Sequence, residues 1–76
     1  MNDRRRTVLR RAVSILETVL NIVECSYDDE KECLNNMPEN LEGSDRYEKM
    51  ENAVEQLEDA ISSIEDARDA LEEAVQ

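Results

Sequence analysis

Apolar residues recur at alternating steps of four and three through the first half of the chain, which is the period of an amphipathic helix. The pattern covers residues 3–35, and Glu30 is its one polar interruption. These apolar residues are Leu9, Val13, Leu16, Leu20, Val23, Tyr27, Leu34 and Met37. In heptad notation (positions a–g), Val13 is at a and Leu16 at d. The sequence therefore predicts a long helix over residues 3–35 with one apolar seam.

The second half of the chain has the same period between residues 45 and 75, with Arg68 as the interruption. Its seam residues are Tyr47, Met50, Val54, Leu57, Ile61, Ile64, Leu71 and Val75. Beside this seam, alanines recur every seven residues at g, namely Ala53, Ala60, Ala67 and Ala74. Because interaxial distance depends on side-chain size, we expect this alanine column to let a neighbouring helix approach closely.

Residues 36–44 separate the two periodic segments and contain the only proline and the only glycine, Pro38 and Gly43. Proline disrupts a helix interior, and glycine suits a left-handed backbone position. Ser44 is a favourable N-cap for the helix that follows. The predicted helices have matching lengths of roughly 48 and 46 Å at 1.5 Å per residue. We therefore expect a single all-α domain over residues 1–76, folded as an antiparallel two-helix hairpin.

The first helix carries more apolar residues than a hairpin needs. Further apolar residues lie at c and g, namely Val8, Ala12, Ile15, Val19 and Ile22. On the other flank, Arg10, Glu17 and Glu24 occupy e and mark the side that stays wet. An exposed contiguous apolar patch of this kind is rare on monomers. The pattern predicts self-association through these five residues, as an antiparallel homodimer that forms a four-helix bundle.

The formal net charge is −11, and its distribution is uneven. Five of the nine basic residues are arginines that precede residue 12. They oppose the dipole of their own helix, so we expect the hairpin to place carboxylates of the second helix beside them. Those carboxylates are Glu65, Asp66, Asp69, Glu72 and Glu73. An acidic body repels phosphates, and no apolar run has the length of a membrane span. We expect neither direct nucleic-acid binding nor membrane association.

Residues that carry catalysis are missing from this composition. The chain has no His, no glycine-rich phosphate loop and no Ser or Cys nucleophile beside a base. The acidic run at residues 28–32 lacks the spacing and the Gly of a calcium loop. We therefore expect no enzymatic activity, no cofactor and no metal site.

Cys25 and Cys33 lie about 12 Å apart along one predicted helix, which is beyond the reach of a disulfide. The arginines near the N-terminus lead into an amphipathic helix and not into the apolar core of a signal peptide. These two features favour reduced thiols and a cytoplasmic location.

One stretch resembles a known family. From Asn36 to Glu48 the chain reads N-M-P-E-N-L-E-G-S-D-R-Y-E, followed by L-E-D-A-I at residues 57–61 and I-E-D-A at residues 64–67. These strings look like small acidic helical proteins of Gram-positive bacteria, their phages and other mobile elements. The resemblance covers about the C-terminal half and implies a mobile-element accessory protein. It brings no established activity and no catalytic residue.

Two classes of function fit these patterns. The first is a self-associating helical module for protein–protein interaction. The second is a phage-type inhibitor of a host defence or DNA-binding protein, whose carboxylates imitate the charge of a nucleic acid. The acidic surface for such a partner would consist of Glu51, Glu55, Glu58, Asp59, Glu65, Asp66, Glu72 and Glu73.

Overall fold

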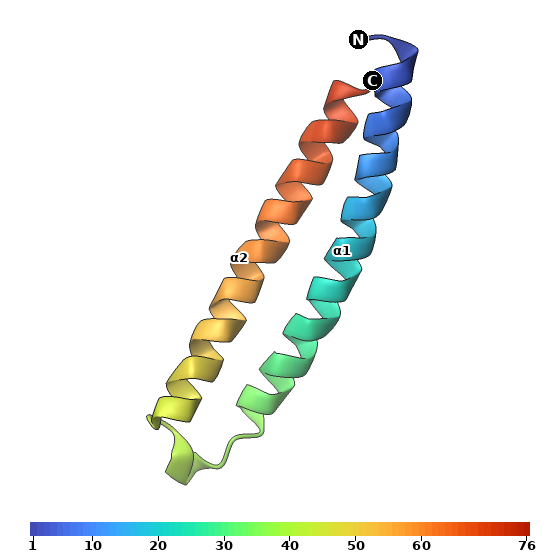
Figure 1. The fold of residues 1–76 in the computed structure, drawn as a ribbon. Helices are drawn as coiled ribbons and strands as arrows, with labels where there is room; N and C mark the ends of the chain where they lie inside the picture. Colours follow the sequence, from blue (N-terminus) through green and yellow to red (C-terminus); the bar gives the residue numbers. More distant parts are fainter.

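The computed structural model describes every residue from Met1 to Gln76 and consists of two long helices side by side in opposite directions (Figure 1). The first helix, α1, spans Asp3–Asn35, and the second, α2, spans Asp45–Ala74. A short 3-10 helix, η1, spans Glu39–Leu41 between them. There is no strand. The predicted all-α hairpin is confirmed; α2 ends one residue earlier than expected, with Val75 as its C-cap.

Each long helix begins with a side-chain cap. The Asn2 Oδ1 atom accepts a hydrogen bond of 2.9 Å from the backbone N–H of Arg5. The Ser44 Oγ atom accepts one of 3.2 Å from the backbone N–H of Tyr47. An aspartate follows each cap, where negative charge complements the dipole of the helix. These short-range interactions explain why both helices begin where they do.

The turn uses its proline and its glycine in different ways. Pro38 precedes η1 in an extended conformation, so the chain leaves α1 before the single 3-10 turn. Gly43 has a φ of +83°, the left-handed region that favours glycine. The Ser44 N–H then donates to the carbonyl of Leu41, which closes the turn just before α2.

The core is a single row of contacts between the two seams. Only Leu20, Val54 and Val75 are buried. The remaining predicted seam residues are half-buried, including the two interruptions Glu30 and Arg68. With one layer of contact, the hairpin covers its seam residues without enclosing most of them.

The molecule is a rod of 59 × 14 × 14 Å. Its radius of gyration is 17.3 Å, whereas a compact domain of this length would have about 11 Å. The two chain termini lie together at the end opposite the turn (Figure 1). In such a rod every residue is close to the surface, so the faces of the helices carry whatever function the protein has.

Candidate functional site

One edge of the hairpin is polar and charged. The Tyr27 hydroxyl donates to Glu58 Oε1 at 2.6 Å and accepts a 3.1 Å hydrogen bond from Lys31 Nζ. Lys31 and Glu58 occupy e positions of α1 and α2, so the two e columns share this edge. Arg10, another e residue, donates to the Val75 carbonyl at 3.4 Å. We call this side the polar edge; it holds both hydrogen bonds that join the two long helical segments.

The lysine on the polar edge is held in its charged form. The hydrogen bond to Tyr27 is the main cause that raises the pKa of Lys31 above the usual 10.5, and the negative charges of Glu58 and Asp28 act in the same direction. The ammonium also lies 5.4 Å from the centroid of the Tyr27 ring. Lys31 is an ammonium at neutral pH, and the Tyr27 hydroxyl is its hydrogen-bond acceptor.

The arginines near the N-terminus do not form the expected ion pairs with α2. The two ion pairs of the structure join Arg6 to Asp3 and Arg68 to Asp69, each within one helix. The contact across the hairpin is instead Arg10 with the Val75 carbonyl, at the negative end of the α2 dipole. Direct pairing with the α2 carboxylates was therefore a wrong expectation. Arg4, Arg5 and Arg11 are exposed and pair with no carboxylate, whereas Arg6 is half-buried.

The five residues predicted to mediate self-association lie together on α1. Val8 and Ile22 are each 61 % exposed, Ile15 55 % and Val19 37 %, while Ala12 is half-buried. Of the six large apolar residues that are exposed in the whole chain, these four share one face. We call the five residues the apolar row. The apolar row is not covered by α2, because the row lies beside the seam of α1, on the side opposite the polar edge.

From Ala53 to Ala74, the side of α2 next to the apolar row carries no charge and consists of alanines with Gln56 and Ser63. The e columns of α1 and α2 share one edge of the hairpin, so their g columns share the opposite edge. The alanine column of α2 therefore lies on the same side as the apolar row of α1. Ala53 and Ala60 are half-buried, whereas Ala67 and Ala74 are exposed. The sequence argument missed that position c of α2 continues this surface. The small-residue strip consists of Ala53, Gln56, Ala60, Ser63, Ala67, Ala70 and Ala74.

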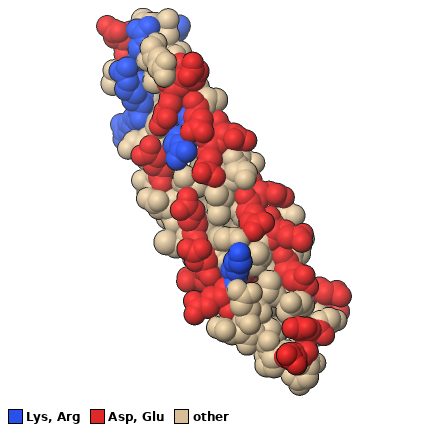
Figure 2. Space-filling view, turned by 180° about the vertical axis from the view of Figure 1, so that it is seen from behind, with Lys and Arg blue, Asp and Glu red and all other residues tan.

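The acidic residues proposed as a partner surface occupy two sides of α2. Glu51, Glu58, Glu65 and Glu72 are e residues on the polar edge, and Glu55, Asp59, Asp66 and Glu73 lie at b and f on the outer side. Seven of the eight are exposed, and Glu65 is half-buried. Glu58 is the one that also accepts a hydrogen bond from α1, and none of the eight forms an ion pair. On the face shown in Figure 2, basic side chains gather at the end where the chain begins and acidic side chains follow the rest of its length. This surface presents unneutralised carboxylates to any cationic partner.

Other chemistry has little support in the structure. Cys25 and Cys33 are exposed free thiols. No group of three or more His, Cys, Asp or Glu side chains is placed to hold a metal ion. Neither long helix has a stretch that is apolar and long enough to cross a membrane. Two open hollows exist; one is lined by Asn2, Arg4, Arg5, Val8 and Leu9 beside the start of the apolar row.

Searches of protein-family models, curated proteins and solved structures find no match to this chain. The hairpin has two unlike sides: one is charged, and the other joins the apolar row to the small-residue strip.

Proposed function

We propose that this protein is a non-enzymatic, acidic helical module for protein–protein interaction that works as a homodimer. The observation that carries the proposal is the exposure of the apolar row along α1. The resemblance of residues 36–67 to small proteins of phages and mobile elements adds the proposal that it is an accessory protein of such an element.

The free energy available from the apolar row is large for a chain of this size. Complete burial of a Val or Ile side chain is worth about 1.5–3 kcal/mol, and about half of that remains for a side chain that is already half covered. In a homodimer, the burial of these side chains contributes to the free energy of association twice, once for each chain. Meanwhile the hairpin alone buries only three residues. Covering the apolar row is therefore a strong driving force for association.

Light scattering on the wild type and on an Ile15→Glu, Ile22→Glu variant tests the dimer. We expect the wild type to run as a dimer at tens of micromolar and the variant as a monomer, because two carboxylates would have to be buried in the interface. A Ser14→Glu, Asn21→Glu variant adds the same charges to the exposed b positions of α1 and should still dimerise. A monomeric wild type, or a dimeric Ile15→Glu, Ile22→Glu variant, would contradict the proposal.

A second candidate function is inhibition of a host defence or DNA-binding protein by charge mimicry. The observation that favours it is the row of exposed, unpaired carboxylates on α2. This acidic surface lies outside the apolar row, so a dimer would still present it. It would bind a basic groove that normally holds a nucleic acid.

The salt dependence of partner binding tests charge mimicry. We expect the affinity for a partner isolated from a host lysate to fall steeply between low and high salt, as it does for duplex DNA. A Glu51→Gln, Glu55→Gln, Asp59→Asn variant should bind more weakly and show a shallower salt dependence. As a control, Glu17→Gln, Glu24→Gln and Asp28→Asn remove three exposed carboxylates from α1 and should leave the affinity nearly unchanged. An affinity that is the same at low and high salt would refute mimicry.

A further inference from the structure

Two columns of residues on different helices match in position and differ in size. Val8, Ile15 and Ile22 recur every seven residues on α1, and Ala60, Ala67 and Ala74 do the same on α2. On antiparallel helices, columns with the same spacing give pairs whose residue numbers have a constant sum. This holds for Val8 with Ala74, Ile15 with Ala67, and Ile22 with Ala60. The two columns therefore have the same spacing along the antiparallel hairpin, and both belong to the half of the rod that holds the chain termini (Figure 1).

We infer that two copies dock with α1 of each on the small-residue strip of α2 of the other, so that both turns lie at the same end of the four-helix bundle. This inference rests on the proposed homodimer and specifies its geometry: the two hairpins lie parallel to each other, in place of the antiparallel pair that the sequence pattern suggested. The two-fold axis runs along the rod, and each apolar row occupies the alanine column of the other copy. Neighbouring helices are antiparallel, as in the hairpin itself.

Side-chain size favours this arrangement. A large side chain opposite a small one lets facing layers interdigitate at a constant distance between the helix axes. In the opposite arrangement, with the turns at opposite ends, α1 would lie on α1 and α2 on α2. Val and Ile would then face each other along one pair of helices and alanines along the other pair. The two pairs would need different axial distances, which two rigid hairpins cannot both satisfy.

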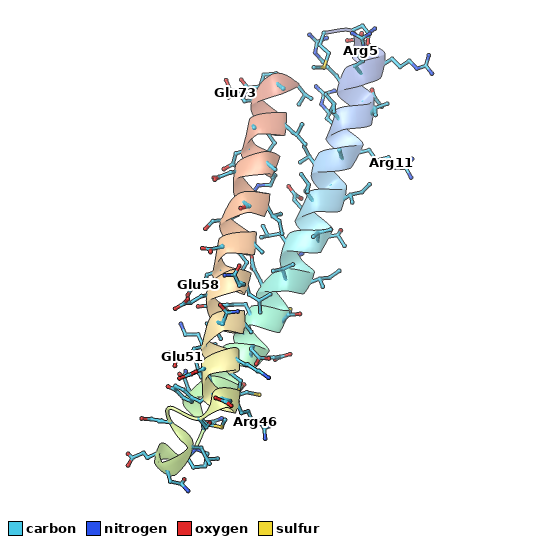
Figure 3. The ribbon with its side chains drawn as sticks, turned by 60° about the vertical axis from the view of Figure 1, so that its left-hand side comes forward. Arg5, Arg11, Arg46, Glu51, Glu58 and Glu73 are labelled. Atoms are coloured by element: carbon cyan, nitrogen blue, oxygen red, sulfur yellow. The ribbon has the colours of Figure 1, made fainter.

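Charge complementarity supports the same arrangement at both ends. Arg11 of one copy comes within one helical turn of Glu73 of the other. Within a single chain these two side chains point away from each other, and neither forms an ion pair (Figure 3). Near the turns, Asp29 and Glu32 come within about one turn of Lys49 and Arg46 of the other copy. Such complementary rims fix the orientation of a complex more than its affinity.

The surface is also large enough for a stable dimer. A rectangle with the length and width of the rod, 59 × 14 Å, covers about 800 Å², which is one partner's share of a standard stable interface.

The distance between spin labels at the two turns tests the orientation. The experiment uses full-length protein with Cys25→Ser and Cys33→Ser, and a label on Asn40→Cys in the exposed η1 segment. We expect a short distance, comparable to the width of the bundle. Turns at opposite ends would instead give a distance near the 59 Å length of the rod and would overturn the inference. A label on Thr18→Cys, near the middle of α1, gives a short distance in both dimers and serves as the positive control.

A size exchange tests which helices face each other. Ile15→Ala should weaken dimerisation by roughly tenfold or more, since a two-fold dimer loses the side chain twice. Ala67→Ile should also weaken it, by placing Ile against Ile. The combination of both should recover most of the affinity, because the large and small partners have only changed places. Ser62→Ile places the same side chain on the outer face of α2, and together with Ile15→Ala it should give no recovery.

The outcomes separate this inference from the proposed function. A wild type that is monomeric in light scattering would overturn both. A dimer with distant turns, or one without recovery in the Ile15→Ala, Ala67→Ile variant, would overturn the inference and leave the homodimer standing. Close turns together with recovery support both.

Discussion

Tyr27 is the residue that joins the two helices by a polar side-chain contact. It occupies an a position of the seam, but its hydroxyl extends to the polar edge, where it donates to Glu58 and accepts from Lys31. Tyr47 occupies the corresponding a position of α2 and makes no side-chain hydrogen bond. The two tyrosines thus form a natural comparison within one chain, one with and one without a polar partner.

Replacing Tyr27 by Phe should lower the free energy of unfolding by at most about 1 kcal/mol. The aromatic ring stays in the seam, and only two exposed hydrogen bonds are lost, the one to Glu58 and the one from Lys31. Urea unfolding followed by circular dichroism measures this change. Tyr47→Phe is the matched control and should change the free energy of unfolding by much less. Equal losses in both variants would show that the Glu58 contact adds nothing to stability.

At the scale of the elements, the conformation of the turn determines whether the apolar seams of α1 and α2 can pack against each other. Its one demanding backbone position is Gly43, with a φ of +83°. A Cβ atom added there would meet no atom within 4 Å, so the side chain itself would not clash. The cost of a substitution at this position is therefore that of the backbone conformation alone.

We expect Gly43→Ala to lower the free energy of unfolding by about 1–2 kcal/mol, the cost of a left-handed conformation for an L-residue. Gly43→Asn should cost less, because Asn tolerates this region better. The denaturant dependence of the free energy should stay the same in both, since the surface exposed on unfolding does not change. A Gly43→Ala variant as stable as the wild type would show that the turn relaxes to another conformation.

At the scale of the whole molecule, the rod has too little core for its length. Three buried residues and a radius of gyration of 17.3 Å place nearly all side chains near water. Small domains usually need an additional source of stability, and association is one of the common sources. For this chain the apolar row and the small-residue strip are the surfaces on which association would add to the core.

The melting temperature should therefore depend on protein concentration. Binding that occurs only in the folded state stabilises by mass action, and we expect an increase of about 3–6 °C for each tenfold rise in concentration. Circular dichroism melts over two decades of concentration measure it. The Ile15→Glu, Ile22→Glu variant should melt at a lower temperature that does not change with concentration. A constant melting temperature in the wild type would mean that the hairpin is stable alone.

Much of the hairpin could be predicted from short-range patterns. The three-and-four spacing of apolar residues defines one face of each helix, and Ser44 and Gly43 act within a few residues of where they stand. The apolar row was found in the same way, because its residues also follow the helical period. The c positions of α2 were missed, since small polar residues such as Ser63 and Gln56 give no apolar signal by themselves.

The sequence alone determined which residues share a face of each helix, because that follows from the helical period within a single element. Only the tertiary structure decided what lies across from each face. The antiparallel packing brings both e columns to the polar edge and both g columns to the other edge. It also places Arg10 at the Val75 carbonyl and leaves the α2 carboxylates without an ion pair to the arginines of α1. These contacts depend on how the two helices are rotated about their axes and on their register along the rod. The seams consist of similar aliphatic residues, which do not fix the rotation or the register closely enough to predict an individual hydrogen bond.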